Sequence, residues 1–106
     1  MRDQPHDFAD LHSLLLEAQR SITVAPDGAL EGVGDVIRSA LSRVEAETPA
    51  GAPLHAQLDN VRKWLDALDR PADHDRFGGT KHLREYVLMQ LRLALGALEE
   101  YERETK

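Results

Sequence analysis

The sequence YVLMQLRLALGAL, residues Tyr86–Leu98, decides the fold class because its apolar residues recur three and four positions apart, as on an α-helix. We predict a long C-terminal helix over roughly Thr80 to Glu104 around this stretch. At about 100° per residue, its apolar side chains form two stripes on the helix surface. The first stripe comprises Leu83, Val87, Leu88, Leu91, Ala94, Leu95 and Leu98, and the second comprises Tyr86, Met89, Leu93 and Ala97.

The second stripe indicates a second packing surface. A helix on the surface of a monomer faces only one core, so the extra stripe indicates either a central position in a bundle or contact with another chain. Glu85, Arg92 and Glu99 share one sector of the helix and need water, so the helix cannot be enclosed on every side. We therefore expect a two-fold homodimer joined through this stripe, with burial in the monomer core as the alternative. The predicted interface residues are Tyr86, Met89, Leu93 and Ala97.

Three shorter amphipathic segments precede this helix. The first begins near Asp7 and continues to about Arg20, after which the residues SITVAP either extend the helix or form a short connector. The second covers about Gly28 to Glu47 with Asp27 as its N-cap, and the third begins at Pro53. Their apolar faces are Phe8, Leu11, Leu15, Ala18 and Ile22; Leu30, Val33, Ile37, Ala40, Leu41 and Val44; and Leu54, Leu58, Val61, Leu65 and Leu68.

Short connections between these segments favour antiparallel neighbours. The sequence therefore predicts an all-α protein, a four-helix up-and-down bundle with a long C-terminal helix. We expect one helical domain over residues 1–106, with frayed ends at 1–6 and 104–106 and Thr80 capping the last helix. In the second helix we expect Asp35, Arg38, Ser42 and Glu45 to face away from the core.

Composition argues against several classes of partner. Nineteen acidic residues against thirteen basic ones give a net charge of −6, and the arginines are scattered, so we expect no nucleic-acid binding. The longest uncharged run is too short to span a bilayer, and the polar start MRDQPHDF does not resemble a signal peptide. We expect no membrane association and a cytoplasmic location. The absence of cysteine excludes disulfides and thiolate chemistry.

No motif predicts catalysis or a cofactor. The five histidines are His6, His12, His55, His74 and His82, and none belongs to the repeated Glu-x-x-His pattern of di-iron bundles. We interpret Asp73-His74-Asp75 as a polar turn, and Gly78-Gly79-Thr80-Lys81 lacks the spacing of a nucleotide-binding loop. We therefore predict no catalytic residue, no metal ligand and no bound cofactor.

These observations favour a non-enzymatic protein–protein interaction module that associates with itself through the C-terminal helix. Two alternatives remain open. The first is an acidic inhibitor or adaptor for a basic protein, for which the C-terminal carboxylates would steer binding. The second is a carrier or sensor of a small apolar ligand, indicated by the small residues Ala94, Gly96 and Ala97 beside larger neighbours. The carboxylates in question are Glu99, Glu100, Glu102 and Glu104.

Overall fold

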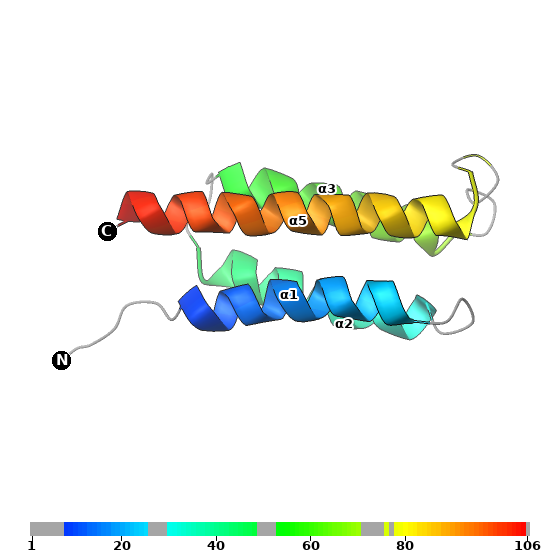
Figure 1. The fold of residues 1–106 in the computed structure, drawn as a ribbon, viewed down its shortest axis with the longest axis horizontal. Helices are drawn as coiled ribbons and strands as arrows, with labels where there is room; N and C mark the ends of the chain where they lie inside the picture. The colour runs from blue at the N-terminus through cyan, green and yellow to red at the C-terminus, as the bar shows by residue number, and fades with distance from the viewer. Residues whose placement is uncertain (1–7, 26–29, 49–52, 71–75, 77, 106) are drawn as a thin grey trace.

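The computed structural model describes residues 8–25, 30–48, 53–70, 76 and 78–105, and within them the chain forms four helices and no strand. The helices are α1 (Phe8–Val24), α2 (Leu30–Ala46), α3 (Pro53–Leu68) and α5 (Thr80–Thr105). They form an up-and-down bundle in which α1 and α2 make one antiparallel pair and α3 and α5 make the other (Figure 1). The predicted all-α bundle with a long C-terminal helix is therefore confirmed.

Apolar side chains from all four helices meet in one core. Val33, Leu88 and Leu95, which the periodicity also assigned to the core, lie partly exposed at its margin. The other predicted core residues with described side chains are buried. They are Leu11, Leu15, Ala18 and Ile22 in α1; Ile37, Ala40, Leu41 and Val44 in α2; Leu54, Leu58, Val61, Leu65 and Leu68 in α3; and Leu83, Val87, Leu91, Ala94 and Leu98 in α5.

The structure resolves the uncertain end of the first helix. Residues 21–24 continue α1 to Val24, and Ala25 donates its backbone N–H to the carbonyl of Ser21 at 3.1 Å. Ile22 falls on the same face as Leu11 and Leu15 and is 1% exposed. Burial of this side chain explains why β-branched residues continue a helix here, because packing outweighs a weak intrinsic propensity.

The beginning of the last helix corrects one prediction. Leu83 donates its N–H to the carbonyl of Gly79 at 3.2 Å, so Gly79 occupies the cap position and Thr80 is the first helical residue of α5. The expected cap at Thr80 was wrong. The last helix also continues to Thr105, into the segment predicted to fray, whereas residues 1–6 and the expected cap Asp27 lie outside the described residues.

The helix α5 packs against both α1 and α3, and polar contacts set its direction. His12 Nε2 donates to Glu102 Oε2 at 2.9 Å, and Arg84 Nη1 donates to the carbonyl of Ile22 at 3.1 Å. Each contact joins the beginning of one helix to the end of the other. The two bonds therefore hold α1 and α5 antiparallel over most of their length.

The contact between α2 and α3 is smaller and depends on ion pairs. Arg38 Nη2 lies 2.8 Å from Asp66 Oδ1 and 2.7 Å from Asp69 Oδ2, and Arg62 Nη1 lies 2.7 Å from Glu45 Oε1. Arg38 and Glu45 lie outside the apolar core, as predicted, but both side chains are partly buried because they contact charged groups of α3. Asp35 and Ser42 are exposed, as predicted.

Candidate functional site

The four predicted interface residues divide into two groups on α5. Met89 and Leu93 are 53% and 49% exposed, while Tyr86 and Ala97 are half-buried and pack against the core. Tyr86 contacts Trp64 of α3, and Leu93 and Ala97 line a hollow together with a residue of α3. We refer to the exposed pair, Met89 and Leu93, as the α5 ridge.

Tyr86 is covered within the monomer by an aromatic neighbour. Its ring centroid lies 4.6 Å from that of Trp64 on α3, and the two ring planes are tilted by 31°. Such a tilted arrangement is a favourable geometry for two aromatic rings. Much of the Tyr86 surface is therefore already used to join α3 to α5, and only its outer edge is available to another molecule.

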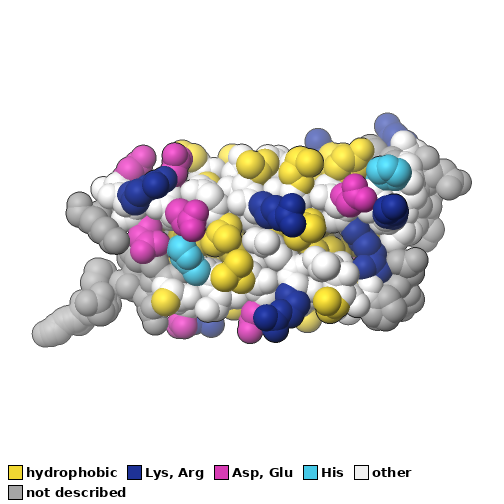
Figure 2. Space-filling model, in the orientation of Figure 1, with side chains coloured by type: hydrophobic (Ala, Val, Ile, Leu, Met, Phe, Trp, Pro, Cys, Tyr) yellow, Lys and Arg dark blue, Asp and Glu magenta, His cyan; other side chains and the backbone are white. Residues whose placement is uncertain are grey.

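The α5 ridge is exposed because no other helix lies over it. Met89 and Leu93 are one turn apart, so their side chains are neighbours on the outer surface of α5. Figure 2 shows a row of hydrophobic side chains along the upper edge of the molecule, with charged side chains towards both ends of the row. The other large exposed hydrophobic residues are Leu16 and Val24 on α1 and Val36 on α2. Within the described part of the chain, only Met89 and Leu93 form a pair one helical turn apart.

A shallow hollow adjoins the α5 ridge over Gly96. It has a volume of about 450 Å³ and is lined by Gln57 of α3 together with residues of α5. A Cβ atom built on Gly96 would have no neighbour within 4 Å, so the α5 backbone is uncovered at this point. The α5 residues around the hollow are Arg92, Leu93, Gly96, Ala97, Glu99, Glu100 and Arg103. An apolar ridge thus meets a charged rim of both signs.

The predicted acidic run does not form one continuous surface. Glu99, Glu100 and Glu104 are exposed, whereas Glu102 is partly buried in its ion pair with His12. Adjacent positions on a helix point about 100° apart, so Glu99 faces a different side of α5 from Glu100 and Glu104, which lie one turn apart on the same face. Arg103 lies among them. The acidic adaptor therefore remains an alternative without a concentrated patch to support it.

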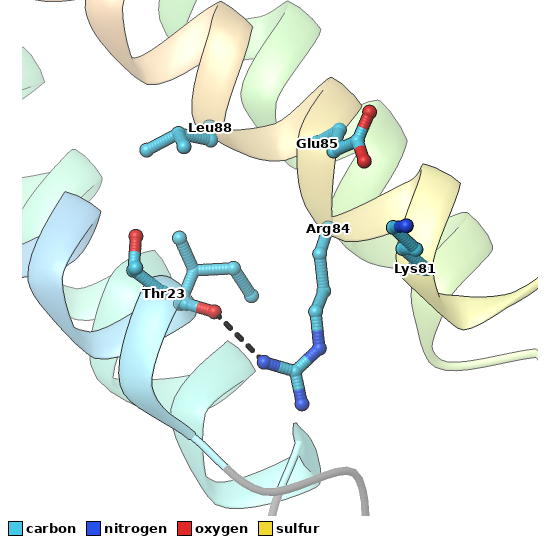
Figure 3. Close-up of a pocket in the computed structure, with 6 residues that line it drawn as sticks. Thr23, Lys81, Arg84, Glu85 and Leu88 are labelled. Atoms are coloured by element: carbon cyan, nitrogen blue, oxygen red, sulfur yellow. Dashed lines mark hydrogen bonds between the residues drawn. The ribbon is translucent and has the colours of Figure 1, made fainter.

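A second hollow lies between the end of α1 and the beginning of α5 (Figure 3). Its volume is about 180 Å³, which is below the usual size of ligand pockets, about 300–1,000 Å³. Arg84 extends across it to the Ile22 carbonyl, as the dashed line in Figure 3 shows. Its lining is Ile22, Thr23, Lys81, Arg84, Glu85 and Leu88. The idea of an apolar ligand between the helices stays a prediction.

The described histidines are each bonded to one neighbour. Besides the His12–Glu102 pair, His55 Nε2 lies 2.8 Å from the Thr48 hydroxyl, and His82 Nδ1 lies 2.7 Å from the carbonyl of Gly78. Among residues 8–25, 30–48, 53–70, 76 and 78–105, no three His, Asp or Glu side chains are grouped so that they could hold a metal ion. His6 and the Asp73-His74-Asp75 turn lie outside these ranges.

Two arginines between α2 and α3 are the polar residues whose role the sequence did not reveal. Burial disfavours the charge on Arg38, but hydrogen bonds to Asp69 and Asp66 outweigh it and raise the pKa of the guanidinium. Arg62 shows the same balance, since burial is outweighed by its bonds to Glu45 and Asp59 and its pKa is raised. Both arginines therefore stay charged whenever the protein is folded. Because both arginines join α2 to α3, we assign them a structural role. The α5 ridge is therefore the candidate functional site.

Comparison of the chain with protein families, with curated proteins and with solved structures found no match. None of the described helices combines the length and the apolar character that crossing a membrane requires. The functional interpretation therefore rests on the surface chemistry of α5.

Proposed function

We propose that this chain is a non-enzymatic protein–protein interaction module that forms a homodimer through the outer face of α5. The α5 ridge is the observation that carries the proposal. Two adjacent large apolar side chains, each about half exposed, lie on a helix whose other apolar residues are buried or partly buried. Tyr86 and Ala97 border the ridge, and a two-fold axis would cover it with an identical ridge from a second copy.

The ridge supplies part of the free energy that a dimer of moderate affinity needs. Complete burial of a Met or Leu side chain contributes about 1.5–3 kcal/mol, so covering the exposed half contributes about 1 kcal/mol per side chain. Four such side chains in a dimer contribute about 4 kcal/mol, while a micromolar dissociation constant corresponds to about 8 kcal/mol. The remainder must come from contacts around the ridge, and we expect dissociation constants in the micromolar range.

The test is the mass of the protein in solution, measured by light scattering over a range of concentrations. The variant Met89→Glu/Leu93→Glu places charges in the proposed interface and should be a folded monomer at concentrations where the wild type is a dimer. Retained helical circular dichroism will show that the variant is folded. A wild type that is monomeric at high micromolar concentration contradicts the proposal.

A matched control separates the interface from a general effect of added charge. Leu16 and Val36 are 52% and 58% exposed, close to the values for the ridge, but lie on α1 and α2. The variant Leu16→Glu/Val36→Glu carries the same extra charge and should dimerise like the wild type. Equal dissociation of the two double variants would show that the ridge has no special role.

A further inference from the structure

We infer that the two copies pair their α5 helices antiparallel, with His82 of each copy beside Glu100 of the other. This inference rests on the proposed dimer and specifies its register. The observation is a symmetric arrangement of charge and apolar surface along one line of α5. His82 lies at one end of the line, Glu100 at the other, and the α5 ridge between them.

The spacing places these residues on the same face. His82 and Glu100 are 18 residues apart, which is five turns of an α-helix and about 27 Å along its axis. Both side chains are exposed. Met89 and Leu93 lie about 20° to either side of the line from His82 to Glu100. Each is two residues from the midpoint of that line. The midpoint is at the level of Leu91, whose own side chain is buried in the core.

A two-fold axis perpendicular to α5 at this midpoint exchanges positions that are equally far from it. It therefore brings His82 opposite Glu100 of the second copy and Met89 opposite Leu93 of the second copy, and each contact occurs twice. A parallel arrangement would instead place Glu100 opposite Glu100. Charge complementarity therefore selects the antiparallel pairing, and the ridge supplies its apolar centre.

The side chain of His82 is oriented for such a contact. A carbonyl oxygen can only accept a hydrogen bond, so Nδ1 donates to the Gly78 carbonyl at 2.7 Å. Among the described residues, none bonds to Nε2, which can therefore meet a group of the second copy. In the imidazolium form, Nε2 donates to a carboxylate. Gly78 has a φ of 88°, and a Cβ atom there would lie 2.8 Å from Nδ1, so a glycine at this position makes room for the ring.

The other charged groups of α5 lie further from the line. Among them, Glu104 is one turn beyond Glu100 and about 40° from the line, on the side that turns towards α3. Arg92 is about 80° away around the helix and Glu99 about 100° away, on the side that turns towards α1. Arg103 follows Glu100 and is about 60° away on the same side. These groups stand at the rim of the proposed contact. Glu99 therefore provides a control that is adjacent in sequence and equal in charge.

Charge exchange tests the register. With His82 in the imidazolium form, Glu100→Lys alone and His82→Glu alone should each raise the dissociation constant about tenfold, because each replaces two attractive contacts with two repulsive ones. The combined variant His82→Glu/Glu100→Lys should return to within about threefold of the wild type, while Glu99→Lys should change the constant less than about twofold. If Glu100→Lys strengthens association, or if the combined variant is no better than the single ones, the register is wrong.

Crosslinking gives an independent measurement because the natural chain has no cysteine. An equimolar mixture of His82→Cys and Glu100→Cys should form a crosslinked dimer with a short bismaleimide, whereas each variant alone should not. Crosslinking of each variant by itself would indicate parallel helices and overturn the inference. If these tests fail while the wild type is a dimer and Met89→Glu/Leu93→Glu is a monomer, only the register is refuted. A monomeric wild type refutes the proposed function as well.

Discussion

Replacing Arg38 with alanine should lower the free energy of unfolding by about 1–2 kcal/mol, although Arg38 lies outside the apolar face of α2. Its Nη2 atom carries two hydrogens, which reach Asp66 at 2.8 Å and Asp69 at 2.7 Å on α3. An exposed ion pair contributes about 0.2–1 kcal/mol, and hydrogen bonds to charged groups contribute more when partly buried. Arg38 and Asp69 are 30% and 32% exposed, so the contribution of their ion pair lies between that of an exposed pair and that of a buried one. Asp66 is 55% exposed and contributes less to the free energy of unfolding.

Urea unfolding followed by far-ultraviolet circular dichroism measures this effect. Arg20→Ala is the control, since Arg20 lies exposed on α1 and its loss should cost less than about 0.5 kcal/mol. The cost of Arg38→Ala should shrink in about 1 M salt, where charges are screened beyond about 3 Å. A double-mutant cycle with Asp69→Ala isolates the pair. If the cycle shows no coupling, or if Arg38→Ala is as stable as Arg20→Ala, the ion pairs do not hold α2 to α3.

Two further predictions concern α2. Ile37→Ala should cost about 2–5 kcal/mol in the same urea experiment, because Ile37 is fully buried and its removal leaves a cavity; a cost below about 1 kcal/mol would contradict the placement of this face. Gly32→Ala should stabilise the protein by about 0.5–1 kcal/mol, since a Cβ there meets nothing within 4 Å and alanine favours the helix. Gly34→Ala should stabilise the protein less than Gly32→Ala does, because its Cβ would lie 3.3 Å from Arg38 Nη1 and crowd the ion pairs. An equal increase in the free energy of unfolding for both variants would refute this reasoning.

The fold could be predicted because apolar periodicity and chain breakers agree along the whole sequence. In α3, Pro53 marks the first helical residue, and the predicted apolar face from Leu54 to Leu68 is the buried face. The end of α1 could not be predicted, because residues 21–24 have weak helical propensity and are held in the helix by packing of Ile22. Local pattern decides most of each helix, and tertiary packing decides its last turn.

The direction of charged side chains was harder to predict than that of apolar ones. Periodicity separates the core side of a helix from all other sides, but it does not separate a side that faces water from one that faces a neighbouring helix. Arg38 and Glu45 fall on the polar side of α2, yet both point to α3 because partners of opposite charge stand there. The sequence did contain a signal for the position of Arg38, namely two aspartates one turn apart near the end of α3, Asp66 and Asp69. This signal can be interpreted only when α2 and α3 are known to be antiparallel neighbours.

The second stripe of α5 has two physical causes, which the sequence alone could not separate. A helix with neighbours on two sides covers more of its circumference than a helix with one, and α5 packs on α1 with Leu88 and on α3 with Tyr86. Packing inside the monomer therefore accounts for Tyr86 and, beside the core, for Ala97. It does not account for Met89 and Leu93, whose side chains remain 53% and 49% exposed. The case for association between copies consequently depends on these two side chains, and a substitution at either one probes the contact without disturbing the core that the other two support.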